Sequence, residues 1–278
     1  MVVAYGPPGP LEHALGALEG RFPVTVVDNG SDAATEAAAR RHGARYHHSG
    51  ANLGFAAGVN VALGTIDLDT ADVLLLNPDA RITPDGLERL HDALAADSRL
   101  AAVGPAIAGA PTGWPWHTPL RPWAEAVGGA RRTPGRTFLS GAVLLLRGRA
   151  LAEVGPLDPR FFLYAEEEDW QRRALRQGWR VRHCPEVEAA HASGGTDRDI
   201  DRLLLRLHAA TERYVRKWYG RTGWLVYRSG VIAGQLARTA VRRGWPRARA
   251  WRLARLYVAG PDRQARRAGA VPPPGQPA

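Results

Sequence analysis

LLLNPDA, residues 74–80, is the stretch that decides the fold of this chain, because three leucines run directly into Asn77, Pro78 and Asp79. A short apolar run bounded by a turn signal is typical of a buried strand. A strand that ends in this way presents an amide and a carboxylate at one edge of its sheet. In open α/β sheets, ligands collect outside the carboxyl ends of the strands. Asn77 and Asp79 are therefore candidate binding residues.

Apolar runs of strand length alternate with helical patterns around this stretch. The expected strands are residues 1–5, 24–28, 72–77 and 100–104, and the expected helices between them are 10–20, 32–43, 54–64 and 83–97. Thr83 is the expected N-cap of the last helix, with Pro84 at its first position. The alternation predicts an α/β fold with a mostly parallel central sheet flanked by helices. Asp28 and Asp79 both fall at carboxyl ends of its strands.

The second half of the chain is less regular. Residues 108–136 are rich in Gly, Pro and Trp and are expected to form a long loop, which a strand at 137–148 follows. A helix then opens on four consecutive acids in AEEEDW, residues 165–170, and a further helical stretch covers 198–219. We expect the last residues, VPPPGQPA, to be unstructured.

Positive charge is concentrated at the end of the chain. Residues 1–212 carry 22 Lys and Arg against 26 Asp and Glu, a balance of −4, whereas residues 213–278 carry 15 against one, a balance of +14. We therefore expect a catalytic or binding domain at 1–212 and an Arg- and Trp-rich helical extension at 213–278. The extension could be a solvated helical pair, a nucleic-acid-binding surface or an interfacial membrane anchor.

Several classes of protein are disfavoured by what the sequence lacks. The single cysteine, Cys184, excludes an intramolecular disulfide and a thiolate zinc cluster. The glycine-rich dinucleotide fingerprint and the P-loop motif are both missing. The sequence has no uninterrupted apolar run of about 18 residues, so it predicts no transmembrane helix. The first residues do not resemble a signal peptide. The expected location is the cytoplasm.

Four motifs carry candidate chemistry, although each has an ordinary structural explanation. VVDNGSD (26–32) and NLGFAAGVN (52–60) are rich in turn formers. The acids of residues 166–169 would be favoured by the dipole of a helix N-terminus, but four in a row exceed what capping requires. His191 in AAHASGGT is a single histidine, and such residues are more often structural than functional.

The order of these motifs is more specific than any one of them. It resembles family-2 glycosyltransferases of the GT-A fold, and most closely the rhamnosyltransferase-like branch that builds cell-wall or surface polysaccharide. The resemblance covers about residues 1–200. It implies an enzyme that binds a nucleotide-diphosphate sugar as its donor. The donor site would contain Tyr5, Asp28, Asn29, Ser31, Asn52, Gly54, Asn77 and Asp79.

The same resemblance implies a metal ion and a catalytic base. Asn77 and Asp79 stand where the family has its Asp-x-Asp motif, so that Asp79 and His191 would ligate Mn²⁺ or Mg²⁺. Glu167 stands at the position of the base, which is usually an aspartate in the family. The extra methylene leaves Glu166 and Asp169 as alternatives for this role. Trp170 would lie on the acceptor side.

The expected reaction is inverting and metal-dependent, with a cell-wall, polysaccharide or polyprenyl-diphosphate-linked acceptor. Because acceptors in this branch are often lipids, we favour an anionic membrane surface as the partner of the basic extension, and we consider nucleic acid unlikely. The enzyme would then be peripheral at the inner face of the cell membrane. Two alternatives remain: a nucleotidyltransferase acting on sugar phosphates, and a non-catalytic module that binds nucleotide-sugar or RNA.

Overall fold

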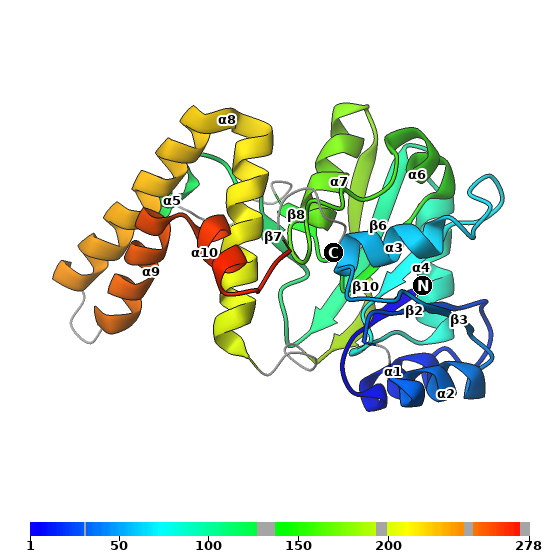
Figure 1. Cartoon of the computed structure of the whole chain (residues 1–278). Coiled ribbons are helices and arrows are strands. Elements are labelled where there is room, and N and C mark those ends of the chain that lie inside the picture. The colour runs from blue at the N-terminus through cyan, green and yellow to red at the C-terminus, as the bar shows by residue number, and fades with distance from the viewer. Residues whose placement is uncertain (31, 127–136, 193–198, 242–246, 273–278) are drawn as a thin grey trace.

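Two larger sheets, one two-stranded sheet and the flanking helices make up most of the first two thirds of the chain in the computed structural model (Figure 1). The structure describes residues 1–30, 32–126, 137–192, 199–241 and 247–272. The first sheet is parallel, in the order β1 (Val2–Ala4), β2 (Thr25–Asp28) and β3 (Arg45–His48). The second is mixed, in the order β4 (Val73–Leu76), β9 (Val143–Leu146), β6 (Leu100–Ala108), β10 (Arg180–His191) and β5 (Ala80–Arg81).

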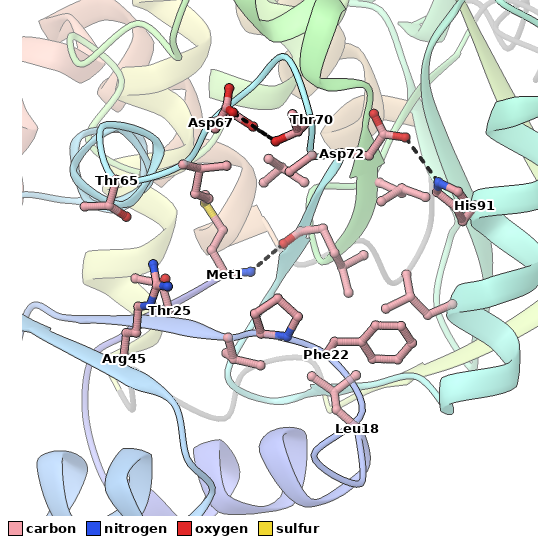
Figure 2. A pocket seen from close by; sticks show the side chains of 18 of the residues that line it. Met1, Leu18, Phe22, Thr25, Arg45, Thr65, Asp67, Thr70, Asp72 and His91 are labelled. Carbon is pink, nitrogen blue, oxygen red and sulfur yellow. Dashed lines mark hydrogen bonds and ion pairs between the residues drawn. The ribbon is translucent and has the colours of Figure 1, made fainter.

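Met1 joins the two sheets. Its amino group donates to the carbonyl of Leu74 at 2.7 Å (Figure 2). Its own carbonyl accepts from the amide of Leu76 at 3.1 Å. This pattern places β1 beside β4 and parallel to it. The carboxyl ends of β1, β2 and β4 therefore open at the same edge, where sequence analysis expects the donor site.

The predicted α/β fold with helices around a central sheet is confirmed, but the direction of β9 was not foreseen. This strand runs antiparallel to both β4 and β6. Its four residues, VLLL, are all buried, and a strand buried on both faces has the same apolar pattern in either direction. The expected strand at 137–148 is also divided, because β8 (Thr137–Leu139) ends before residues 140–142 and pairs with β7 (Gly113–Pro115).

Five of the helices that flank the sheets follow the sequence signals, and the one at residues 148–154 was not predicted. The flanking helices are α1 (Pro8–Gly16), α2 (Ala33–Arg41), α3 (Phe55–Leu63), α4 (Pro84–Ala95), α6 (Gly148–Val154) and α7 (Glu166–Arg176). The side chain of Thr83 accepts a hydrogen bond from the amide of Gly86, and Pro84 occupies the first position of α4. The predicted N-cap is thus confirmed.

Helices also make up most of the remaining chain (Figure 1): α5 (Arg121–Ala126), α8 (Ile200–Val241), α9 (Arg247–Ala259) and α10 (Pro261–Arg267). Helix α8 is kinked at Gly220, whose φ is 66°. The expected boundary between 212 and 213 falls inside α8, before this kink. A core cluster unites Phe161 of the first part with Tyr214, Trp224 and Tyr257, so the helices pack on the body. The domain division itself stays a prediction.

Some expectations about the ends of elements fall where the structure is not described. Residues 127–136 of the expected loop and the final 273–278 lie outside the described residues. In the described ranges, no helix combines the length and the apolar character needed to cross a membrane.

Gly148 is a position where the fold leaves no room for a side chain. Its amide donates to Asp72 at 2.9 Å, and a Cβ there would lie 2.2 Å from the carbonyl oxygen of Ala71. We predict that Gly148→Ala lowers the free energy of unfolding by about 1–3 kcal/mol, because backbone must move. Gly9→Ala is the control, since a Cβ at Gly9 meets nothing within 4 Å. Urea unfolding of both variants tests this, and equal stabilities would contradict it.

Candidate active site

The end of the leucine strand meets the end of β10, and this contact brings Asp79 to His191. In the antiparallel β5–β10 pair, His191 lies opposite Ala80, and the amide of Ala192 donates to the carbonyl of Asp79 at 3.0 Å. The Oδ1 atom of Asp79 lies 3.1 Å from Nε2 of His191. The side-chain amide of Asn77 lies 3.4 Å from the same nitrogen. Three of the predicted residues therefore converge.

The spacing of this pair fits a divalent metal ion. Two ligands at about 2.1 Å from an octahedral ion and 90° apart are about 3 Å from each other, close to the observed separation of Asp79 and His191. Neither side chain is more than 18% exposed. In the described part of the chain, no group of three His, Cys, Asp or Glu residues gathers into a metal site. Substrate oxygens and water would have to complete the shell, as is common for Mg²⁺ beside phosphates.

A cleft of about 200 Å³ surrounds this pair. Of the predicted residues it is lined by Tyr5, Asn29, Asn52, Gly54, Asn77, Asp79 and His191. The later chain adds Phe162, Leu163, Tyr164 and Leu203, which sequence analysis did not single out. The first three of these belong to the aromatic run FFLY that precedes the acids, so their position beside that motif was the available signal.

Gly54 is fixed by contact with the same aromatic run. Its φ is 80°, and a Cβ would lie 2.3 Å from the carbonyl oxygen of Phe162. That oxygen also accepts the amide of Phe55 at 2.7 Å. The first turn of α3 is thereby held against the segment that leads into α7. Only glycine suits this conformation and this close approach.

Asn29 is the predicted donor residue with spare hydrogen-bonding capacity. Its amide nitrogen donates to the carbonyl of Gly54 at 2.9 Å. Its Oδ1 atom is buried and has no hydrogen-bond partner among the described residues. A buried acceptor of this kind costs free energy unless something donates to it, so Asn29 is suited to accept from a ligand.

The carboxylate of Asp28 is engaged in the turn that follows β2. Asp28 does not line the cleft, and its carboxylate accepts from the amides of Gly30 at 2.7 Å and Asp32 at 3.2 Å. The hydroxyl of Tyr46 donates to it at 2.8 Å. Burial and this carboxylate raise the pKa of Tyr46 to about 12. Asp28 therefore organises the turn after β2. Ser31 lies outside the described residues.

The acids of α7 begin directly after two residues in a left-handed conformation. Tyr164 and Ala165 have φ values of 72° and 68°. Such residues cost of order 1–3 kcal/mol each and cluster at functional sites. Glu167 packs on Gly141, where a Cβ would be 3.4 Å from the Cβ of Glu167. The neighbouring carbonyl of Ala142 accepts the amide of Asn77 at 2.9 Å, which links Glu167 to the end of the leucine strand.

The carboxyl groups of Glu166 and Glu167 are both shielded from solvent, and this desolvation disfavours their charged forms. Burial raises the pKa of Glu167 to about 7. Burial, together with the charge of Glu167, raises the pKa of Glu166 well above its ordinary value. The Oε2 atom of each is buried without a partner among the described residues. Glu167 does not line the cleft itself, but a carboxyl that titrates near neutrality next to the strand end that carries Asn77 is a candidate acid or base.

Asp169 is committed to the core rather than to the cleft. Its side chain is fully buried and contacts Nζ of Lys217 at 2.6 Å, the indole nitrogen of Trp218 at 2.9 Å and Nε of Arg173 at 3.1 Å. These contacts occupy both carboxylate oxygens and tie α7 to α8. The structure therefore gives no support to Asp169 as an alternative base.

Trp170 is likewise buried in the core. It is 1% exposed, and its indole N–H donates to the carbonyl of Gly155 at 3.0 Å. This position does not face an acceptor, in contrast to the expectation. The hydrophobic period of a helix explains the difference, because Trp170 is followed by Ala174 on the same buried face.

Glu168 was not among the predicted residues, although it belongs to the same run of acids. Its two oxygens accept from the amide of His117 at 2.7 Å and contact Nδ1 of the same residue at 2.7 Å. A loop contact at a separation of 51 residues leaves no local pattern in the sequence. Of the four successive acids, Glu168 and Asp169 are therefore paired, whereas Glu166 and Glu167 each keep an oxygen without a partner among the described residues.

A larger cavity of about 810 Å³ lies at the opposite edge of the sheet, at the amino ends of β2 and β4 (Figure 2). Asp72 and His91 face each other there at 3.5 Å. None of the candidate catalytic, donor-binding or metal-binding residues lines this cavity. The smaller cleft is therefore the candidate site, because it collects the chemistry and lies at the carboxyl ends of the strands.

Comparison with known proteins places this geometry in context. The model of the family "Glycosyl transferase family 2" matches residues 10–155. The N-acetylglucosaminyl-diphospho-decaprenol L-rhamnosyltransferase of Mycobacterium tuberculosis is 29% identical over 288 aligned positions, which cover 87% of this chain and 94% of that protein. The low-salt glycan biosynthesis hexosyltransferase of Haloferax volcanii is 24% identical over 203 positions, 69% of this chain and 66% of that protein.

Solved structures share the fold at low sequence identity. The mannosyltransferase of Pyrobaculum calidifontis in complex with GDP-mannose and Mn²⁺ has a TM-score of 0.59 at 19% identity, covering 95% of this chain and 81% of that one. Glucosyl-3-phosphoglycerate synthase of Mycobacterium tuberculosis, with Mn²⁺, UDP and phosphoglyceric acid, has a TM-score of 0.58 at 16% identity, covering 78% and 76%.

The burial of Glu167 predicts a pH-dependent effect on stability. Its pKa rises from 4.5 in the unfolded chain to about 7, so the stability linked to its protonated form is complete below about pH 4.5 and is lost as the pH rises through 7. Relative to wild type, Glu167→Gln is expected to gain stability between pH 5 and pH 8, by up to about 3 kcal/mol. Urea unfolding at both pH values measures this.

The matched control is Asp169→Asn, which removes a paired carboxylate instead of an unpaired one. It is expected to lose about 3 kcal/mol, because two cations remain without their partner. If the stability difference between Glu167→Gln and wild type were the same at pH 5 and pH 8, the raised pKa of Glu167 would be wrong.

Proposed function

The chain belongs to glycosyl transferase family 2, and we propose that it transfers rhamnose or a similar hexose from a nucleotide-diphosphate sugar to a lipid-linked or polysaccharide acceptor, with inversion at the anomeric carbon. The observation that carries this proposal is the convergence of Asp79, His191 and Asn77 at one cleft, with Glu167 held beside the same strand end. The family match favours transfer of a sugar over the nucleotidyltransferase and non-catalytic alternatives.

The cleft offers separate groups for the parts of a donor. Tyr5 is 41% exposed at its edge and could stack on a nucleobase. The unpartnered Oδ1 of Asn29 could accept from a base or a ribose hydroxyl. Asp79 and His191 would hold Mn²⁺ or Mg²⁺, and when bound this ion would act as a Lewis acid toward the leaving diphosphate. A site with one carboxylate and one imidazole suits Mn²⁺ somewhat better.

Glu167 is the proposed base. The acceptor oxygen forms a bond to the anomeric carbon while the bond from that carbon to the diphosphate oxygen breaks, and Glu167 takes the hydroxyl proton. A pKa of about 7 leaves a large fraction ionised at neutral pH while keeping the carboxylate basic enough to accept a proton. Burial and the charge of Glu167 raise the pKa of Glu166, which favours its neutral form beside the base. The transfer needs no covalent enzyme intermediate.

A lipid-linked acceptor is supported by the relative that shares most of the chain's length. That protein's name specifies N-acetylglucosaminyl-diphospho-decaprenol as acceptor and rhamnose as the transferred sugar. We carry the class of acceptor, a polyprenyl-diphosphate-linked sugar, to this chain as a proposal. Screening dTDP-, UDP- and GDP-sugars for release of the nucleoside diphosphate, with and without such an acceptor, tests the function directly.

We further propose that the helical extension lies on an anionic membrane at the inner face of the cell. Large apolar side chains are exposed on it among arginines: Leu225 is 58%, Trp251 54% and Val258 59% exposed. Interfacial helices combine apolar and basic residues in this way. Because Trp224, Tyr227 and Tyr257 belong to a core cluster shared with Phe161, deleting the extension would unfold that core, and surface substitutions are the better test.

Asp79→Asn is predicted to abolish turnover and the effect of Mn²⁺ on donor affinity, because it removes the only carboxylate of the proposed pair. Glu167→Gln is predicted to lower kcat by about 10²–10⁴-fold, with little change in donor affinity, since it keeps the shape but cannot take the proton. Initial rates and donor binding by calorimetry separate the two. Full activity of Asp79→Asn, or activity that a chelator does not reduce, would refute the metal site.

The membrane proposal predicts weaker binding to vesicles when its apolar residues are replaced. Replacing Leu225, Trp251 and Val258 together by serine is expected to release the protein from phosphatidylglycerol vesicles in a flotation assay while transfer to a water-soluble acceptor continues. Wild-type binding is expected to fall with salt, because the Debye length shrinks from about 10 Å at 0.1 M to about 3 Å at 1 M. Equal flotation of the triple variant would contradict the proposal.

A further inference from the structure

An arginine-lined cavity of about 430 Å³ lies where α8, α9 and α10 meet. It shares no lining residue with the donor cleft. The basic residues in its wall are Arg216, Arg228, Arg263 and Arg266. This number of guanidinium groups around one cavity is unusual, because like charges at close range repel one another unless anions offset them.

The carboxylates in the wall compensate only part of this charge. Glu212 and Asp262 line the cavity, so the four arginines exceed the acids by two. Arg216 contacts Glu212 at 2.8 Å, and Arg266 pairs with Asp262. Asp262 is shared with a further cation outside the wall, Arg213, at 2.7 Å. The surplus at the cavity is therefore positive.

Helix α9 offsets some of this surplus without removing it. Arg228 donates to the carbonyl of Val258 at 2.9 Å, and Arg263 donates to the carbonyl of Ala259. Both carbonyls belong to the last turn of α9, where the helix dipole is negative. These contacts and the two carboxylate pairs occupy one nitrogen of each guanidinium. A guanidinium carries five N–H donors, so the cavity wall keeps donors for a ligand.

Trp224 provides a second, independent sign of an incomplete site. It lines the cavity, is 1% exposed, and its indole N–H has no hydrogen-bond partner among the described residues. The guanidinium of Arg216 lies over its ring, 5.6 Å from the centroid. A buried donor without a partner costs about 1–3 kcal/mol, and the native fold nevertheless keeps it at the wall of a positively charged cavity.

We propose that this cavity binds a phosphate group. Phosphate oxygens match the fork of N–H groups that each arginine presents, and such contacts are often bidentate. Two sources share this chemistry: the headgroup of an anionic lipid and free inorganic phosphate or pyrophosphate. The exposed side chain of Val258 lines the cavity, and Leu225 is one helical turn from Arg228 on the same face of α8. This apolar rim favours the lipid.

The first experiment measures binding of inorganic phosphate and pyrophosphate by calorimetry. It uses the full chain with Asp79→Asn and a chelator, so that metal-bridged binding in the donor cleft does not contribute. The site variant is Arg228→Gln with Arg263→Gln. The control is Arg221→Gln with Arg267→Gln, which removes the same charge at two exposed positions that do not line the cavity. We expect at least tenfold weaker binding in the site variant and unchanged binding in the control.

A conservative variant guards against a purely structural loss. Arg228→Lys with Arg263→Lys keeps the charge and one donor toward each carbonyl of α9, but loses the fork. It is expected to fold with wild-type stability and to bind pyrophosphate more weakly than wild type. If wild type binds neither anion, or if the site variant binds as tightly as the control variant, the phosphate site does not exist.

The second experiment identifies the source of the phosphate. Flotation with vesicles of phosphatidylcholine, alone or mixed with phosphatidylglycerol, is compared for the site and control variants. Selective loss of binding in the site variant would assign the cavity to a lipid headgroup. Equal vesicle binding by both variants, together with selective loss of pyrophosphate binding, would assign it to a free phosphate compound. Neither outcome depends on sugar transfer, so a failed donor screen leaves the test intact.

Discussion

The pairing of β5 with β10 is the constraint on which the proposed chemistry depends. Two residue pairs, Ala190 with Arg81 and His191 with Ala80, bring together segments more than 100 residues apart. Side chains in strands alternate between faces, so a slip of one residue in this short ladder would turn His191 away from Asp79. The amide of Ala192, which donates to the carbonyl of Asp79, helps to fix the register.

The first turn of α7 divides four successive acids among different tasks. Glu168 holds the loop at His117, and Asp169 holds α8 through Lys217 and Trp218. These two are fully buried and paired, whereas Glu166 and Glu167 each keep a buried oxygen without a partner among the described residues. The paired acids stabilise the packing around the turn. The unpaired acids are costly to the fold, as is common for groups retained for function.

The strand ends that meet at the cleft could be predicted from the sequence, but the environment of each acid could not. Local signals were sufficient for the N-cap at Thr83 and for strand ends that bring Asn77 to the edge of the sheet. The pairing of Asp169 and the turn formed by Asp28 depend on partners far along the chain or on loop geometry, and neither leaves a periodic pattern. The antiparallel direction of β9 was hidden for a related reason, because a fully buried strand has no polar face to orient it.

The proposed function depends most directly on whether Asp79 and His191 hold a divalent ion against the diphosphate of the donor. Pulsed electron paramagnetic resonance of Mn²⁺ bound to the protein with a nucleoside diphosphate measures this directly, through couplings of the ion to nearby nuclei. We predict that Mn²⁺ couples to phosphorus and to an imidazole nitrogen, and that the nitrogen coupling is lost in His191→Ala. Nitrogen coupling that persists in His191→Ala, or Mn²⁺ that binds without any nitrogen coupling in the wild type, would contradict this prediction.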